Sequence, residues 1–495
     1  MNQTNQVLRS SLGGTRLDGR MGPEGLPLRS GINSLARSSG IAIAGGLVSQ
    51  ALKALVMILL ARGFGPVQFG AFSFANSVNA FLFILAQFGL PIFGAREVAH
   101  LDAVPGGLLR AITGARLLLG TIGTFVALVV LFFLPGVTRE EFWLVAGFGL
   151  SNIALSFVYD WVFQGAGELH LWAVVNIAWQ GLWLVFTVGV IEAKGSVVLA
   201  SIGYAAAAAL TALIAWPWLH RLRRNRGLSS APRRYSMFGV LKATANLGAG
   251  TLLITVLVWT DTIIVRFVKG EEAAGVYAAG NRISLALSML GSFYVLGAFP
   301  ALSRLAAAAS DEFSQHFQRV YEDLALLFVP GAAWAILFAP RIMIILFKRP
   351  DYLTGVNVFR IFQVFLLLAV ASNLFGMGVL VTHGRDRAYR KVLLISAALM
   401  LVLCPMFAMR WGLEGAAAAV SLSQGLSLVL FLVESNDLVR IGHVKTLGLP
   451  LLIGIVPLLP RLIFRDAFWY SVALLAVAYL GIALWRQPLV RVAME

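Results

Sequence analysis

The chain has 495 residues, of which 59% are hydrophobic and 13% are charged, and its formal net charge is +16. Little polar sequence is left over to build a soluble catalytic domain. The single cysteine, Cys404, excludes an intrachain disulfide and indicates no redox chemistry. The positive charge does not predict a nucleic-acid partner, because the arginines gather in alternate loops, as in cytoplasmic loops of membrane proteins.

About fourteen apolar stretches of roughly 20 residues follow one another, which is the length a helix needs to cross a bilayer. They are continuous runs rather than alternating patterns, so they predict helices and not barrel strands. The sequence therefore predicts an all-α, polytopic membrane protein of about 14 transmembrane helices. We place the spans at 39–61, 69–94, 107–134, 142–165, 169–191, 196–219, 240–267, 273–300, 323–347, 355–382, 391–410, 413–435, 446–464 and 467–485.

The polar segments between spans predict five units along the chain. The loop at 220–239 carries six arginines and no acid, which is typical of a linker that anchors topology, and a lipid-contacting or regulatory role is the alternative. The units are a disordered basic tail (1–38), an N-terminal six-helix lobe (39–219), the basic linker (220–239), a C-terminal six-helix lobe (240–435) and two additional spans (436–495).

The distribution of Lys and Arg predicts the orientation of the chain. Loops on the side of both termini hold about 23 of these residues and loops on the other side about ten, so both termini are expected in the cytoplasm.

The hairpin between the first two spans resembles the hairpin between the seventh and eighth spans. The two match at one constant offset of about 205 residues, and both begin from the same side of the membrane. Parallel repeats imply two lobes around a central cavity, and a chance match between glycine-rich loops is the alternative. The matched positions are Gly65, Gly70 and Phe72 with Gly270, Gly275 and Tyr277.

Motifs of enzymatic chemistry are missing from the sequence. We find no phosphate-binding loop, no zinc-ligand spacing and no nucleophile elbow, so we expect no catalytic residue, no metal and no cofactor. The predicted outer loops are too short for a glycan polymerase or ligase. A purely structural scaffold is a further alternative, and it would not need charges inside the membrane.

We single out four of the ionisable residues inside predicted spans, because charge there is expensive and therefore indicates function. Lys53 and Arg282 would offer positive charge to an anion if they face the cavity. The alternative for Arg282 is a structural ion pair with Asp261, which could otherwise serve ion coupling. Arg116 could extend the cationic path, or it could snorkel to the inner surface.

Neutral amides form stripes on two spans. Carboxamides can bind sugar hydroxyls in a cavity, and they can equally hold helices together. These residues are Asn76, Asn79 and Gln87 on the second span and Asn176 and Gln180 on the fifth.

Three stretches resemble a known family of transporters. They are similar to the polysaccharide-transporter branch of the multidrug/oligosaccharidyl-lipid/polysaccharide exporter superfamily. The stretches are ILLARGFGPVQFGAFSFANSVNAFLFILAQFGLP (58–91), YDWVFQG (159–165) and TDTIIVRFVKGEEAAGVYAAGNRI (260–283), which is followed by FPALSRL (299–305). The resemblance covers about residues 39–440.

This resemblance implies a flippase of the bacterial inner membrane. Its cargo would be an undecaprenyl-diphosphate-linked oligosaccharide for O-antigen, capsule or exopolysaccharide, and its partners would be this glycolipid, membrane lipids and glycan polymerase or assembly proteins. Basic residues in the first and eighth spans, here Lys53 and Arg282, would meet the diphosphate. The alternative is a cation-coupled multidrug exporter of the same superfamily, which would need acids in the cavity, where Asp261 is the clear candidate.

Overall fold

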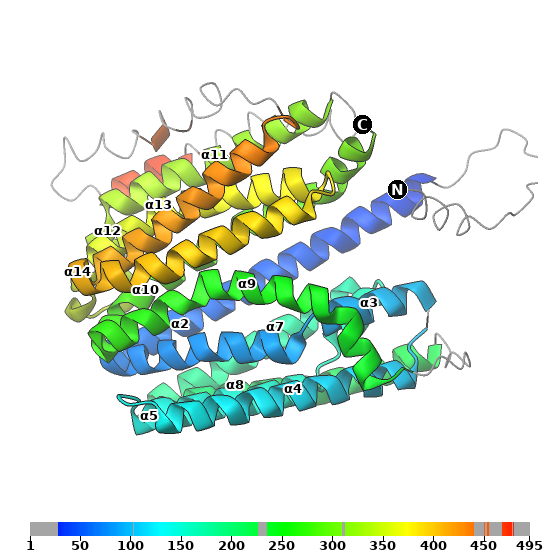
Figure 1. Cartoon of the computed structure of the whole chain (residues 1–495), viewed down its shortest axis with the longest axis horizontal. Coiled ribbons are helices and arrows are strands. Elements are labelled where there is room, and N and C mark those ends of the chain that lie inside the picture. The colour runs from blue at the N-terminus through cyan, green and yellow to red at the C-terminus, as the bar shows by residue number, and fades with distance from the viewer. Residues whose placement is uncertain are drawn as a thin grey trace, which may run out of the picture.

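The computed structural model describes residues 28–101, 103–225, 235–308, 312–439, 450, 453–454, 468–477 and 479. Within these residues the chain is helical and contains no strand. Figure 1 shows long helices that run side by side in one bundle. The predicted all-α class is confirmed.

The helices of the first half of the chain are α2 (Leu28–Gln87), α3 (Leu90–Leu101), α4 (Gly106–Phe133), α5 (Arg139–Leu155), α6 (Asp160–Gly165), α7 (Leu169–Glu192) and α8 (Val198–Asn225). Those of the second half are α9 (Met237–Lys269), α10 (Glu271–Ala307), α11 (Glu312–Leu337), α12 (Ala339–Phe347), α13 (Val356–Phe375) and α14 (Asp386–Ser435). A 3₁₀ turn at Pro350–Gly355 precedes α13, and a π-helical turn at Gly376–Val381 continues it.

Ten of the described helical segments are long and apolar enough to cross a membrane. Two of them contain a glycine with left-handed backbone, Gly65 (φ +79°) in α2 and Gly412 (φ +66°) in α14, where two helices meet. Counting each of these segments as two crossings gives twelve (10 + 2) in the described part. The predicted spans at 446–464 and 467–485 lie largely outside it, apart from the short apolar helix Phe468–Val477.

Several helix boundaries differ from the sequence prediction, among them the following three. Helix α2 begins at Leu28 rather than at residue 39, and residues 1–27 of the predicted tail lie outside the described range. Helix α8 continues to Asn225, into the predicted linker, of which residues 226–234 are not described. Helix α11 begins at Glu312 rather than at 323, because a polar helix start carries no hydropathy signal.

The two halves of the chain form the two sides of the bundle. In Figure 1, α4, α5, α7 and α8 lie below, α10 to α14 lie above, and α2 and α9 run between them. One buried apolar cluster around Trp161 belongs to the first half, and another around Phe317 and Phe375 belongs to the second. A third cluster joins the halves, where Phe69 of α2 meets Tyr352 edge to face with ring centroids 6.5 Å apart.

The outer surface of the bundle is apolar. On α4, the rings of Phe125, Phe132 and Phe133 are 67%, 74% and 77% exposed. Large exposed apolar surfaces are rare on soluble monomers, whereas hydrocarbon favours them. This surface agrees with a multi-pass membrane protein.

The repeated glycines pack against each other across the two halves. A Cβ placed on Gly70 would lie 1.8 Å from the carbonyl oxygen of Glu271, and one on Gly275 would lie 1.9 Å from the carbonyl oxygen of Pro66. The contact is reciprocal at the predicted offset of about 205, which is the pattern of a two-fold interface. Gly65 and Gly270 also share positive φ, at +79° and +92°. The structure confirms the parallel repeat.

We call the end of the bundle that carries Gly65 and Gly270 the turn end, and the end where α2 begins the terminal end. At the turn end, Arg266 of α9 forms an ion pair with Glu141 of α5, and both side chains are buried. Arg266 also contacts Glu271 at 3.0 Å. A second contact between the halves at the turn end comes from Arg349, whose Nε donates to the carbonyl of Arg62 at 2.8 Å. Charged bonds therefore close the turn end across the two halves.

Because Gly70 and Gly275 leave no room for a Cβ, we expect Gly275→Ala to push the halves apart. The expected loss is about 1–3 kcal/mol of stability, as in overpacked cores. The measurement is the melting temperature of the purified protein in detergent. Gly181→Ala in α7 is the control, because nothing lies within 4 Å of its Cβ position. An unchanged melting temperature in Gly275→Ala would contradict the close contact.

We expect Glu141→Gln to destabilise the protein by up to about 3 kcal/mol, because it leaves the buried Arg266 charge with only Glu271. The double variant Glu141→Met/Arg266→Met should recover most of this loss in the same melting assay. Asp437→Asn, which breaks the exposed Arg385–Asp437 pair, is the control and should change the melting temperature little. Equal effects of the buried and exposed substitutions would refute the stabilising role of the Arg266–Glu141 ion pair.

Candidate functional site

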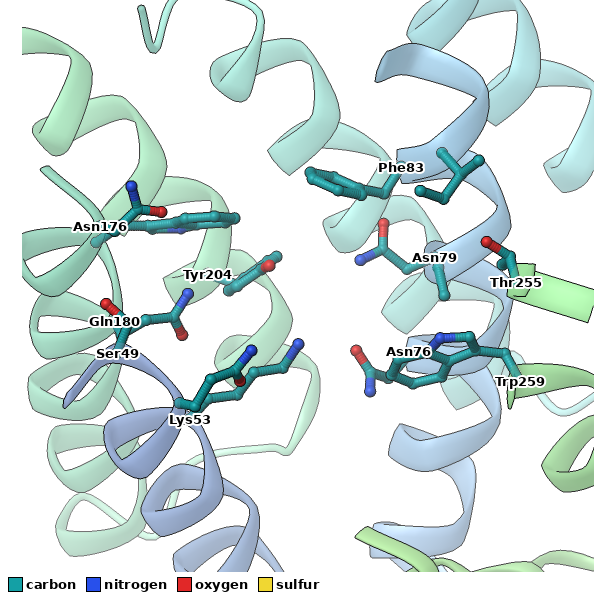
Figure 2. Close-up of a pocket in the computed structure, with 14 residues that line it drawn as sticks. Ser49, Lys53, Asn76, Asn79, Phe83, Asn176, Gln180, Tyr204, Thr255 and Trp259 are labelled. Carbon is teal, nitrogen blue, oxygen red and sulfur yellow. The ribbon is translucent and has the colours of Figure 1, made fainter. Parts of the chain in front are cut away.

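A polar cavity of about 310 Å³ lies between α2, α7, α8 and α9. Figure 2 shows the two arms of α2 on opposite walls, with Lys53 on one arm and Asn76 and Asn79 on the other. In a straight helix, Lys53 and Asn79 would be about 39 Å apart. They face one cavity because the chain reverses at Gly65.

The lining combines amides, aromatic rings and one cation. It consists of Ser49, Gln50, Lys53, Asn76, Asn79, Ala80, Phe83, Ile84, Asn176, Trp179, Gln180, Tyr204, Thr255 and Trp259. This volume lies at the lower end of the range of small-ligand pockets, which are about 300–1,000 Å³.

A buried cation, Arg282, and a half-buried one, Lys53, meet at one indole ring. The Lys53 ammonium lies 5.9 Å from the ring centroid of Trp259, and the Arg282 guanidinium lies 4.2 Å from it. Both residues line a small pocket of about 40 Å³ that shares Gln50, Lys53, Asn76 and Trp259 with the main cavity. Lys53 comes from the first half of the chain, and Arg282 and Trp259 come from the second.

Two of the three guanidinium nitrogens of Arg282 have no hydrogen-bond partner. Its Nη2 donates to the Ser77 hydroxyl at 3.0 Å, while its Nε and Nη1 are buried without a hydrogen-bond partner. In the part of the chain that the structure describes, neither Arg282 nor Lys53 forms an ion pair with an acid. A buried cation without an acid in direct contact is costly, and an anion bound between Arg282 and Lys53 would offset that cost.

Asp261 forms no direct ion pair with Arg282, although their charges interact at longer range, so the contact considered as an alternative is absent. Its carboxylate accepts hydrogen bonds from the Tyr277 hydroxyl at 2.9 Å, from Asn281 Nδ2 at 2.8 Å and from the Thr262 backbone N–H at 2.6 Å. Asp261 is buried within the second half and is not among the residues that line the cavity.

Arg116 also lies apart from the cavity. It is buried on α4 and donates from Nη1 to the Val158 carbonyl at 3.1 Å. Since it is only 2% exposed, it does not snorkel to the surface either.

Four of the five predicted amides line the cavity, and Gln87 does not. Two of the four also serve helix packing: Asn79 accepts from Asn152 Nδ2 at 3.0 Å, and Asn176 donates to its own helix backbone at 2.9 Å. The other two, Asn76 and Gln180, are more than nine-tenths buried, and Asn76 Nδ2 and Gln180 Oε1 have no hydrogen-bond partner. Both roles that the sequence left open are therefore present.

The sequence prediction missed the aromatic lining. Trp259, Trp179 and Tyr204 each sit inside an apolar span, where an aromatic residue at helical spacing usually belongs to the core. Nothing in the local sequence separates a ring that faces a cavity from one that faces another helix. Only the packing of the helices reveals these residues.

A two-lobed helical bundle with a polar, cationic cavity between its halves defines a membrane transport protein. Residues 35–306 match the polysaccharide biosynthesis protein family, and the chain belongs to that family. The chain is also 22% identical over 401 residues to a protein described as "Putative O-antigen transporter" from Escherichia coli (strain K12). This match covers 78% of the chain and 94% of that protein.

Solved structures share the fold. One titled "Lipid II flippase MurJ, inward closed conformation" superposes with a TM-score of 0.68 and 13% identity, covering 90% of this chain and 99% of that one. An inward-facing multidrug resistance transporter of the MATE family, in the MOP superfamily, superposes with a TM-score of 0.61 and 16% identity, covering 81% of this chain and 95% of that one. These likenesses establish the fold of the exporter superfamily.

The contacts of Asp261 predict which substitutions are coupled. In double-mutant cycles, Asp261→Asn and Tyr277→Phe should show a coupling of about 1–3 kcal/mol, because they remove the two sides of one buried hydrogen bond. Asp261→Asn and Arg282→Gln should show a smaller coupling, because these two charges interact without direct contact. Melting temperatures of the purified variants measure both cycles. Rescue of Asp261→Asn by Arg282→Gln would restore the ion-pair interpretation.

Proposed function

We propose that this protein is a flippase for an undecaprenyl-diphosphate-linked oligosaccharide, an O-antigen, capsule or exopolysaccharide unit, in the bacterial inner membrane. It would carry its cargo by alternating access of the two lobes. The observation that carries the proposal is the pair of cations, Lys53 and Arg282, that meet at Trp259 without an acid in direct contact. The family and the fold support it.

The polar groups of the cavity offer what such a cargo needs in order to cross the membrane. A diphosphate crossing hydrocarbon needs its charge neutralised, and its sugars need hydrogen bonds, while the polyprenyl tail remains in lipid. Lys53 and Arg282 supply positive charge, and the free Nε and Nη1 of Arg282 supply donors for phosphate oxygens. Since the two cations come from different lobes, a bound diphosphate would hold the lobes together.

We further propose that both termini lie in the cytoplasm, as the distribution of Lys and Arg predicts. The turn end, closed by Gly70 with Gly275 and by Arg266 with Glu141, would then face the periplasm. Opening of this end would require these contacts to break. Asp261, buried among donors in the C-terminal lobe, is the candidate for ion coupling.

A cation-coupled multidrug exporter is the alternative, and it expects acidic side chains in the cavity. The lining of the main cavity contains Lys53 and no acid. An anionic cargo is therefore favoured over a cationic one.

We expect Lys53→Ala and Arg282→Ala each to abolish transport, because either change removes half of the charge that offsets the diphosphate. The test uses the bacterium that encodes this chain, with its own copy deleted and each variant expressed. Polyprenyl-diphosphate glycans are extracted and measured by mass spectrometry, together with the surface polymer. The expected result is accumulation of one lipid-linked oligosaccharide and loss of the matching polymer.

The matched control is Arg410→Ala, because Arg410 also stacks on a tryptophan, Trp411 at 5.6 Å, but lies on the exposed surface. It should restore export fully, and membrane levels of all variants are compared by immunoblot. An unchanged glycolipid pool in the deletion strain, with altered resistance to cationic compounds, would favour the exporter instead. Normal export with both alanine variants would refute the anion site.

A further inference from the structure

Resting on the proposed function, we propose that two facing sides of the cavity form a binding site for the first, uncharged sugar of the cargo. Asn76 lies on one side, and Gln180, Trp179 and Tyr204 lie on the other. This sugar subsite adjoins the cationic pair that would hold the diphosphate, and Asn76 lines both.

The internal repeat shows that Asn76 is free where its counterpart is occupied. At the offset of about 205 residues that relates the lobes, Asn76 corresponds to Asn281, and Asp261 corresponds to Val56. Asn281 donates to the Asp261 carboxylate at 2.8 Å. In the N-terminal lobe the acid is replaced by buried, apolar Val56, and Asn76 Nδ2 has no partner. The same amide that completes a core in one lobe is left available in the other.

The opposite wall carries further polar atoms without partners. Gln180 is 8% exposed and its Oε1 is unpaired, and the indole Nε1 of Trp179 is buried and unpaired as well. A buried polar atom without a partner costs free energy, so such atoms in a cavity indicate a ligand that satisfies them. Figure 2 shows Gln180 and Asn76 on facing walls.

The aromatic part of this wall is held rigidly. The ring centroid of Tyr204 lies 5.0 Å from that of Trp179 and 4.6 Å from that of Trp183. The Trp183 indole N–H in turn donates to the Ala200 carbonyl at 3.1 Å. Aromatic rings that are fixed by their neighbours lose little entropy on binding. They offer an apolar surface to the C–H face of a sugar ring.

The chemistry of the wall matches a sugar. Each hydroxyl of a sugar both donates and accepts hydrogen bonds, and a carboxamide offers two donors and one acceptor oxygen. Asn76 Nδ2 supplies an unused donor and Gln180 Oε1 an unused acceptor. A site built of such groups discriminates strongly against ligands that lack the hydroxyls.

The charge of the lining selects an uncharged sugar. Lys53 is the one charged residue among the residues that line the main cavity, and it lies beside Trp259 and Arg282. With the diphosphate at this cationic pair, a sugar carboxylate would face only neutral amides and rings. An acidic first sugar would therefore bind less well than a neutral one.

The test measures the contribution of the sugar separately from that of the diphosphate. Purified full-length protein in lipid nanodiscs is titrated calorimetrically with farnesyl diphosphate, with farnesyl-diphosphate-linked N-acetylglucosamine and with the corresponding glucuronic acid compound. We expect N-acetylglucosamine to raise the affinity over farnesyl diphosphate and glucuronic acid to raise it less. Asn76→Leu and Gln180→Met should each reduce the gain from N-acetylglucosamine about tenfold.

Binding of farnesyl diphosphate should be unchanged in Gln180→Met, which also shows that this variant is folded. Because Asn76 also lines the cationic pocket, Asn76→Leu is judged by the ratio of its two affinities, with and without the sugar. Gln87→Met is the matched control, because this amide lies on α2 but outside the lining, and it should change neither affinity. If farnesyl diphosphate binds and the sugar adds nothing, or if the variants keep the full gain, the sugar subsite is refuted and the flippase proposal stands. Failure of the wild-type protein to bind farnesyl diphosphate would refute the flippase proposal itself.

Discussion

Two helices that touch through glycine fix the geometry on which the cavity depends. Gly70 of α2 and Gly275 of α10 approach so closely that backbone meets backbone. Seven residues further along each helix, about two turns on, the same two faces bring Ser77 and Arg282 into a hydrogen bond of 3.0 Å. Both pairs are related by the same offset, so the pseudo-two-fold axis passes between them. The glycine contact thereby places Arg282 at the junction of the lobes, beside Trp259 and near Lys53.

The two lobes share a backbone plan and differ in how they treat polar groups. In the C-terminal lobe, Asp261 collects donors from Tyr277, Asn281 and Thr262 and is satisfied within the core. In the N-terminal lobe, amides and aromatic rings at related depths face the cavity, and several of their polar atoms remain unpaired. The N-terminal lobe therefore provides most of the residues that line the cavity, whereas the polar groups around Asp261 in the C-terminal lobe are paired within its core. A symmetric dimer of identical lobes would lack that division of roles.

Prediction from the sequence succeeded where the bilayer imposes a direct constraint. Span length and apolar composition fix the helices, and the glycine spacing fixes the repeat, because only glycine tolerates both the positive φ at Gly65 and the close approach at Gly70. Prediction failed where the answer depends on which helix face meets which. Asp261 and Arg282 have compatible charge and depth, yet the structure gives Asp261 other partners, and Gln87 shares a stripe with Asn79 but lies outside the lining.

The sequence by itself determined that this is an all-α membrane protein with two parallel repeats and cations inside its spans, because hydrocarbon leaves few solutions for an apolar chain. Tertiary structure alone decided that Lys53 and Arg282 both lie against the ring of Trp259 and that Arg116 donates to a backbone carbonyl. It also decided that Tyr204 and Trp179, which pack against the core, line the cavity as well. The reason is physical: helical periodicity gives each residue a direction around its own helix, but the rotation of a helix against its neighbours is set by packing across the whole bundle.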